Sequence, residues 1–299
     1  MFALNTPAPT VAPSSKPPSR RFRRGRGDRS LQLVLGLILS ALIVSMTMLS
    51  YVWTPYNPLA IDVENRLQPP SPTHLFGTDN LGRDLLSVVM VGGQNSLYIT
   101  LVATTIGLVF GTALGLAAAG APARWGAVIA RISDIGIALP SVLIALVLAT
   151  TLGPGSLSTI VAISAWFVPV TARVVIGPAR QVLALEFIEA AASHGRGRIA
   201  ILVRHVVPNI APLLIVQASI MFGAGILIEA SLSFLGVGAQ PPTPSWGRLL
   251  NEAQPLLQVV PHFALLPGLV IVIAILGFNL LGDGLRVVLD PQFSRRGVS

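Results

Sequence analysis

The sequence predicts an all-α, polytopic membrane protein with six transmembrane helices. Of its 299 residues, 53% are hydrophobic and only 11% are charged, whereas a soluble globular domain carries about 25% charged residues. Four stretches contain no charged residue, and each exceeds the about 20 residues that cross a bilayer as a helix; they are residues 30–61, 85–123, 135–172 and 253–282. These stretches do not alternate polar and apolar residues as membrane β-strands do. A soluble enzyme and an outer-membrane barrel are therefore excluded.

A polar tail precedes the first membrane span. Residues 1–30 are rich in proline and serine and end in a run of arginines, a composition that favours a disordered, basic tail. The apolar run 31–53 is too long for the core of a signal peptide, and it ends with Tyr51 and Trp53, residue types that gather at membrane interfaces. Residues 54–93 hold most of the Pro, Asp and Asn of the first half, so we expect a sizeable extracytoplasmic loop there.

A stripe of small residues marks the second span, 95–119. Gly107, Gly111 and Gly115 recur at every fourth position, so they lie on one face of a helix. Glycines at this spacing let a second helix approach closely, and we assign the stripe to helix packing. Chance in a glycine-rich chain is the alternative interpretation.

Four further spans follow in the second half of the chain. Pro140 predicts a kink in the third span, and Pro169 lies in the fourth. Polar residues separate the later spans, over 178–209 and again over 236–262. The predicted spans are 127–152, 157–176, 210–235 and 263–281; the membrane domain as a whole covers 31–292, and a short tail, 293–299, follows it.

The distribution of basic residues predicts the orientation. With six spans both termini face the same side, and that side carries 17 of the 20 Lys and Arg residues. The other side carries only Arg66, Arg83 and Arg248. Because cytoplasmic loops are enriched in Lys and Arg, we expect both termini in the cytoplasm. The same distribution accounts for the net charge of +8 without a nucleic-acid partner.

Residues that carry chemistry are scarce. Cysteine is absent, which excludes thiolate metal sites and cysteine nucleophiles. The only lysine, Lys16, is followed by a proline, so the chain holds no P-loop for ATP. The four histidines are far apart, and Glu229 is the one acid well inside an apolar run, where a structural hydrogen bond is the favoured role. We therefore expect no catalytic residue, no metal and no cofactor.

The segment 178–209 is the most informative polar stretch. Residues 181–194 are helix formers without Gly or Pro, and Gly195 fits the left-handed residue that ends a helix. A second short helix is expected over 198–207, ending before Pro208. An alanine-rich helix face is shallow enough to enter a cleft of a partner, whereas a hairpin surrounded by water is the alternative.

This segment resembles the EAA signature of ABC importer permeases. The resemblance rests on Glu189-Ala190-Ala191, on Gly195 after three further residues, and on Val207-Pro208. The signature calls for Leu before the proline and for Ile two residues earlier, where this chain has Val207 and His205. The resemblance implies that residues 178–209 form a coupling loop that contacts an ATPase through Glu186, Glu189, Ala190, Ala191, Gly195 and Pro208.

Further segments narrow the resemblance to dipeptide/oligopeptide permeases. In order and spacing, the chain is similar to the C-type transmembrane subunit of that family over His74–Asp84, Leu232–Gly236, Pro241–Trp246 and Asn279–Arg286. One departure is Val287, where the family has Asp. The first segment carries a motif that the resemblance places on the extracytoplasmic side: Thr78, Asp79, Asn80, Gly82, Arg83 and Asp84.

The resemblance implies a non-catalytic transmembrane subunit of an ATP-driven importer of dipeptides or oligopeptides in the bacterial cytoplasmic membrane. Its implied partners are a second permease subunit in a heterodimer, cytoplasmic ABC ATPase subunits and an extracytoplasmic peptide-binding protein. The same machinery for nickel chelates, opines or glutathione is one alternative. An ion-coupled carrier or channel is the other, and the lack of carboxylates near the middle of the spans argues against it.

Overall fold

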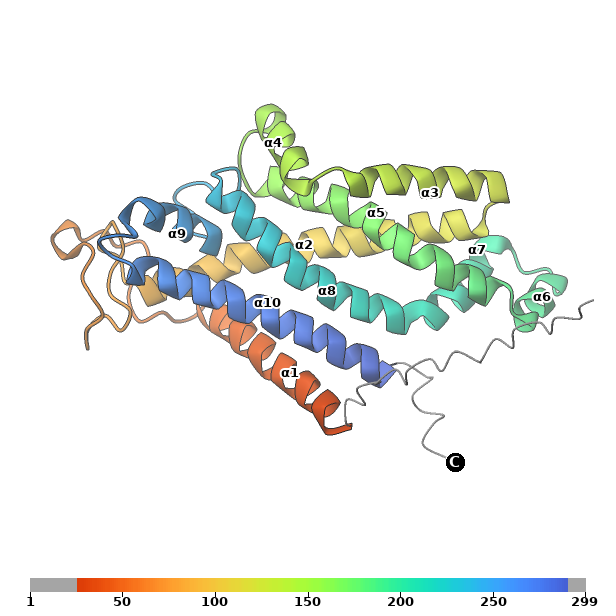
Figure 1. The fold of residues 1–299 in the computed structure, drawn as a ribbon, viewed down its shortest axis with the longest axis horizontal. Coiled ribbons are helices and arrows are strands. Elements are labelled where there is room, and N and C mark those ends of the chain that lie inside the picture. Colours follow the sequence, from red (N-terminus) through yellow and green to blue (C-terminus); the bar gives the residue numbers. More distant parts are fainter. Residues whose placement is uncertain (1–25, 290–299) are drawn as a thin grey trace, which may run out of the picture.

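The computed structural model describes residues 26–289, with side chains described from residue 31 onward. In this range the protein is a bundle of long helices that run along the longest axis of the molecule (Figure 1). The loops around residues 50–84 and helix α9 (Trp246–Ala253) lie at one end, which we call the loop end. The short helix α6 (Glu186–Ser193) lies at the opposite end, the α6 end. The predicted tail 293–299 and most of the tail 1–30 lie outside the described residues.

Helices long enough to span a membrane dominate the described residues. Five stretches are each long and apolar enough to cross a bilayer, and α3 and α4 satisfy the same test only as a pair. The six expected spans are obtained when this pair counts as one. Besides α6 and α9, the elements are α1 (Arg26–Leu49), η1 (Val63–Asn65), α2 (Leu85–Gly120), α3 (Ala123–Ala138), α4 (Ser141–Leu152), α5 (Ser156–Leu183), α7 (Arg198–Ile201), η2 (Leu202–Val206), α8 (Val207–Phe234), η3 (Gln254–Leu256) and α10 (His262–Leu289).

Helix α2 starts earlier than predicted, at Leu85 instead of residue 95, so the predicted loop boundary at residue 93 is wrong. The Asp84 carboxylate caps the helix by accepting a hydrogen bond from the Ser87 N–H at 2.9 Å. Leu85 and Val88 in the first turn are fully buried. The start of α2 is therefore surrounded by protein, not by water.

The predicted third span, 127–152, is two helices that meet at 83°. Leu139, between them, has an extended backbone, and Pro140 forms the N-cap of α4. A residue before proline is pushed out of the helical region, so the chain breaks where the sequence predicted only a kink.

The polar segment after α5 also differs from the prediction. The single helix expected over 181–194 is two pieces, because Leu185 is extended (φ −84°, ψ 142°) and separates α5 from α6. The second helix does not end before Pro208, since α7 passes through the π-helical turn η2 directly into α8. In this turn Val207 donates its N–H to the Leu202 carbonyl, five residues back. A π turn is wider than an α turn, so the helix continues past Pro208 although this proline has no backbone N–H to donate.

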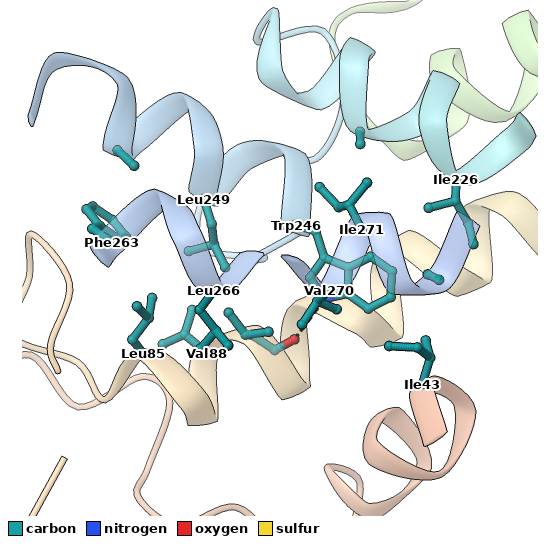
Figure 2. Close-up of a cluster of buried hydrophobic side chains, with 14 of the residues drawn as sticks. Ile43, Leu85, Val88, Ile226, Trp246, Leu249, Phe263, Leu266, Val270 and Ile271 are labelled. Carbon is teal, nitrogen blue, oxygen red and sulfur yellow. Dashed lines mark hydrogen bonds between the residues drawn. The ribbon is translucent and has the colours of Figure 1, made fainter. Parts of the chain in front are cut away.

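A buried apolar cluster at the loop end joins five helices. Figure 2 shows side chains of α1, α2, α8, α9 and α10 converging there. Trp246 at the start of α9 is fully buried and donates its indole N–H to the Val89 carbonyl of α2 at 2.9 Å. Gly247 lets α9 lie directly on α8, because a Cβ at this position would overlap the Ala230 carbonyl. The cluster thus holds α9 firmly against the long helices.

Candidate functional site

Two polar surfaces stand at opposite ends of the bundle. We call residues 184–207 the α6 hairpin, and residues 62–84 together with Arg248 and Glu252 the loop-end network. Within the described residues, no group of three or more His, Cys, Asp or Glu side chains is arranged to hold a metal ion. Both surfaces combine charged and apolar side chains that are available for contacts.

Helix α6 exposes most of its surface. Ile188 is the buried residue of this helix, and Ala191 is half-buried. Apolar and acidic side chains share the exposed surface, which is formed by Leu185, Glu186, Phe187, Glu189 and Ala190. Large apolar side chains exposed beside charged ones are typical of a protein–protein interface.

Gly195 has the left-handed conformation that the sequence predicts, with φ +78°. The Arg196 N–H donates to the Ala191 carbonyl at 3.3 Å and closes the turn behind it. No atom lies within 4 Å of the position that a Cβ on Gly195 would take. Glycine is therefore required here by backbone conformation and not by lack of space.

His205, which departs from the EAA signature, connects the two arms of the α6 hairpin. Arg196 donates a hydrogen bond to its Nε2 atom at 3.1 Å, and its ring meets Phe187 edge-on with centroids 6.1 Å apart. Pro208 lies beyond this contact, exposed in the first turn of α8.

Asp79 organises the loop-end network. Its buried carboxylate accepts hydrogen bonds from the backbone N–H groups of Leu81 and Arg83 at 2.8 and 2.9 Å, and from Arg83 Nε at 2.6 Å. The neighbouring Asn80 is half-buried, and its Oδ1 atom accepts no hydrogen bond within the described residues. The Asp79 contacts fold residues 79–83 into a rigid turn, because they satisfy both oxygens of one carboxylate.

Thr78 and Gly82 fix this turn to the preceding loop. The Thr78 hydroxyl accepts from the Gln68 N–H at 2.8 Å and donates to the Asn65 carbonyl at 2.6 Å. Gly82 has φ +78°, and a Cβ there would overlap the Asp62 carbonyl. The Asn65 amide donates to the Asp62 carboxylate at 2.7 Å and thereby holds the pKa of Asp62 below its ordinary value.

Arg83 joins the turn to α9. Its guanidinium lies 3.5 Å from the Glu252 carboxylate, which also accepts a hydrogen bond from Arg248 Nε at 2.8 Å. A cavity of about 210 Å³ lies beside Arg83, Arg248 and Glu252. The rest of its lining consists mainly of aliphatic side chains and prolines: Leu59, Ile61, Leu81, Pro241, Pro242 and Pro244. The network therefore joins two loops that are far apart in the sequence into one surface.

Asp84 connects this surface to the bundle. Besides capping α2, its carboxylate accepts from the Ser87 hydroxyl at 2.7 Å and lies 3.0 Å from His74 Nδ1. Tyr56 packs on the His74 ring with centroids 4.6 Å apart. The residue at the end of the motif therefore determines where α2 begins.

The glycine stripe of α2 lies against α5 in the same chain. A Cβ on Gly107 would overlap a side chain of α5, and a Cβ on Gly111 or Gly115 would come within 2.5 or 2.8 Å of one. The side chains concerned are, in order, Phe167, Thr171 and Val175. Close packing within the subunit therefore accounts for all three glycines.

Helix α9 is the element beside the loop-end network that the sequence did not predict, because residues 236–262 were expected to form a loop. A signal was present, because residues 246, 249, 250 and 253 are apolar at helical spacing and Ser245 caps the helix by accepting from the Arg248 N–H.

Within α8, Glu229 is fully buried and accepts a hydrogen bond from the Ser233 hydroxyl at 2.7 Å. This structural hydrogen bond is the role that the sequence favours for Glu229.

Comparisons with known proteins fit this arrangement. The family model described as "Binding-protein-dependent transport system inner membrane component" matches residues 107–295. The chain is 38% identical over 295 residues to the dipeptide transport system permease protein DppC of Alkalihalophilus pseudofirmus, covering 96% of this chain and 97% of that protein. It is 40% identical over 273 residues to the glutathione transport system permease protein GsiD of Escherichia coli, covering 91% of this chain and 89% of that protein.

A solved structure supports the fold. An inward-facing structure of the MetNI methionine ABC transporter matches with a TM-score of 0.56 at 17% identity, covering 68% of this chain and 96% of the matched chain. The family model spans more than half of the chain, from the glycine stripe through the α6 hairpin to α10. This chain therefore belongs to the family of binding-protein-dependent transport system inner membrane components, the transmembrane subunits of ABC importers.

Proposed function

We propose that this chain is one of two permease subunits that together form the pathway of an ATP-driven importer for dipeptides and other short peptides. The observation that carries the proposal is the 38% identity, over 96% of this chain, to a permease named for dipeptide transport. Glutathione is itself a short peptide, so the 40% identity to permeases named for glutathione transport fits the same substrate class. Nickel chelates and opines, which the sequence left open, are the alternatives that the uptake experiment below separates from peptides.

The importer needs ATPase subunits because this chain cannot supply that activity. Its only lysine, Lys16, is not part of a P-loop, and the chain is the non-catalytic membrane component. In the proposed complex a second permease subunit completes the pathway, and an extracytoplasmic binding protein delivers the peptide to the loop end. Cytoplasmic ATPase subunits bind at the α6 end.

The proposed orientation follows the basic residues. The α6 end belongs to the side that carries 17 of the 20 Lys and Arg residues, and the loop end carries only Arg66, Arg83 and Arg248. The positive-inside bias favours the α6 end and both termini in the cytoplasm. The loop-end network then faces the compartment from which peptides arrive.

The α6 hairpin is the proposed coupling element. Its exposed surface combines apolar and acidic side chains, and Ala190 and Ala191 are small enough to permit close contact with a cleft. Two residues join α6 to α5, and α7 continues without interruption into α8. Closure of the ATPase subunits therefore displaces two membrane helices at once and switches the side from which the pathway is open.

Charge reversal on α6 tests the coupling role. We expect Glu189→Lys to reduce both ATPase co-purification and peptide uptake, since it places a cation in the proposed interface. Glu64→Lys is the matched control for ATPase co-purification, because Glu64 is an exposed acid at the end of the molecule opposite to α6 and a change of exposed charge costs within about 0.5 kcal/mol of stability. If the ATPase subunits co-purify with both variants at wild-type levels, α6 is not the coupling element.

Uptake by the reconstituted importer tests the substrate class. The intact complex, with its binding protein, is placed in proteoliposomes containing ATP and offered radiolabelled dipeptides, glutathione or a nickel chelate. ATP-dependent accumulation of a dipeptide or glutathione is the expected result. Accumulation of the nickel chelate alone would refute the peptide assignment, and accumulation without ATP would refute the importer mechanism.

A further inference from the structure

A cavity of about 510 Å³ opens at the α6 end, between the end of α2, the first half of α3 and the last turns of α5. Alanines form most of its wall, and their short side chains leave the space open: Ala119, Ala121, Ala123, Ala127, Ala130 and Ala184. Small-molecule sites occupy volumes of about 300–1,000 Å³, so the cavity is large enough for a ligand. Apart from Ala184 at its border, the α6 hairpin does not line this cavity, and the loop-end network lies at the opposite end of the molecule.

Two arginines of α5 line this cavity. Arg173 and Arg180 are seven residues apart, two helical turns, and therefore lie on the same face of α5. Arg173 Nε is 3.3 Å from the Asp134 carboxylate, but both side chains are about half exposed, at 53% and 47%, and such a pair is weak. Arg180 forms no ion pair within residues 31–289. The cavity thus carries excess positive charge, and guanidinium groups bind phosphate through paired hydrogen bonds.

The position of Arg180 fits a layer of lipid headgroups. Arg180 lies in the last turn of α5, a helix long and apolar enough to span a membrane, and a headgroup layer about 5–8 Å thick lies at each end of such a span. Arg173 lies about 10 Å nearer the other end of α5, and the long side chain of an arginine can extend towards the headgroups from there. Trp125, at the start of α3, is exposed beside Arg124, whose guanidinium lies 5.9 Å from the ring centroid; this combination is typical of a membrane interface. An adjoining face of α3 exposes the apolar side chains of Val128, Ile132 and Ile135.

We propose that this cavity binds the phosphate of an anionic phospholipid from the cytoplasmic leaflet. Arg180 and Arg173 donate hydrogen bonds to the phosphate, and the acyl chains lie along the apolar face of α3. Basic pockets between membrane helices on the cytoplasmic side are suited to such headgroups. Inorganic phosphate shares the headgroup chemistry but has no acyl chain to occupy the apolar face, so the two sources are separable by experiment.

Lipid retention by the intact complex tests the proposal. The complex, with its partner permease and ATPase subunits, is placed in phosphatidylcholine nanodiscs with or without phosphatidylglycerol, and bound phosphatidylglycerol is counted by native mass spectrometry. Arg180→Ala should lower the apparent affinity about fivefold, the equivalent of the ~1 kcal/mol that one basic side chain contributes near an anionic leaflet. Ala127→Phe should lower retention by filling the cavity without changing the charge. Arg131→Ala is the matched control, because Arg131 is exposed on α3 but does not line the cavity, and retention should stay at the wild-type level.

Four results would overturn the proposal. If Arg180→Ala retains as much phosphatidylglycerol as the wild type, Arg180 does not bind the headgroup. If Arg131→Ala loses as much phosphatidylglycerol as Arg180→Ala, the lipid is attracted only by the overall positive charge of this end of the protein. If inorganic phosphate stabilises the transporter in phosphatidylcholine nanodiscs as much as phosphatidylglycerol does, the cavity is a site for free phosphate. Cross-linking of Ala127→Cys to the partner permease would show that protein fills the cavity. None of these measurements requires transport, so a negative outcome leaves the peptide-import assignment untouched.

Discussion

Adding one methyl group to the glycine stripe is the most direct test of the α2–α5 packing. In Gly111→Ala the new Cβ would lie 2.5 Å from Thr171 Cβ and 2.6 Å from the Val168 carbonyl oxygen, whereas ordinary contacts begin at 3.4 Å. The helices must therefore separate by about 0.9 Å, the difference between the two values. Overpacking costs about 1–3 kcal/mol, and replacing a helical glycine by alanine returns about 1 kcal/mol. We expect a net loss of about 2 kcal/mol, near the upper limit of this range, because the carbonyl belongs to the backbone and cannot turn away.

Gly268→Ala is the matched control for this prediction. Gly268 also lies inside a membrane helix, α10, but the nearest atom to its added Cβ is Leu250 Cδ2 at 3.9 Å. Only the gain in helix propensity remains there. Thermal unfolding of the purified complex, followed by tryptophan fluorescence in mild detergent, should show a Tm lower by about 4–8 °C for Gly111→Ala and no decrease for Gly268→Ala. Equal Tm values for Gly111→Ala and the wild type would refute the packing argument.

Three further predictions concern the two polar ends. Gly195→Val should reduce peptide uptake and ATPase co-purification, whereas Gly197→Val should not. Both positions have open space, but only Gly195 has a positive φ, a conformation that costs an L-residue about 1–2 kcal/mol. Equal uptake in the two variants would contradict this prediction. Asp84→Ala should lower the stability of the complex by about 0.5–2 kcal/mol through loss of the α2 cap, with Asp84→Asn nearer to wild type in thermal unfolding; a wild-type Tm for Asp84→Ala would show that the cap is dispensable. Single cysteines that replace Arg66 and Asn251, both exposed at the loop end, should react with an impermeant thiol reagent in intact cells. Cysteines at positions 5 and 295, outside the described residues, should react only after permeabilisation. The reverse pattern would reject the proposed orientation.

Hydropathy predicts the long helices well and their ends poorly. Each membrane span is a long apolar stretch, and apolar stretches are visible in the sequence without any knowledge of the fold. The predicted start of α2 is too late because the first turns of this helix, with Leu85, Val88 and Val89, are buried against α9 and α10, which are more than 140 residues away in the chain. A boundary that depends on distant partners leaves no local signal.

The irregularity predicted at Pro140 is present but is a break instead of a kink, and the helix end predicted before Pro208 is wrong. Pro140 breaks a span by 83°, while Pro208 interrupts nothing, because a π turn precedes it. Local sterics are similar at both positions. The difference lies in the neighbours, since Val206 and Ile210 are buried on either side of Pro208, whereas Leu139 and Pro140 are exposed.

The backbone conformation of the candidate site is easier to predict from the sequence than its side-chain contacts. The left-handed Gly195 was predicted from a helix-forming run that stops at a glycine, which is a local pattern. The pairing of Arg83 with Glu252 was not predictable, because charge alone does not select one acid among the 12 acidic residues of the chain. The family resemblance identified Arg83 as part of a motif, and only the fold supplies its partner.

The connections of α6 indicate which membrane helices respond to its displacement. Backbone hydrogen bonds continue from α5 into α6, with Leu185 donating to the Val182 carbonyl at 3.1 Å and Ile188 donating to the Leu185 carbonyl at 2.9 Å. The connection from α6 to α7 contains Gly195 and Gly197 but is hydrogen-bonded as well, since the Arg196 N–H donates to the Ala191 carbonyl at 3.3 Å and the Arg196 side chain donates to His205 Nε2 at 3.1 Å. Both ends of α6 are therefore joined by hydrogen bonds to the elements that lead into the membrane helices. The stripe of α2 holds α5 in backbone contact, and Asp84 ties the far end of α2 to the loop-end network. Movement of α6 is therefore expected to reach the loop end along α5 and α2, and to reach α8 at the same time through α7 and η2.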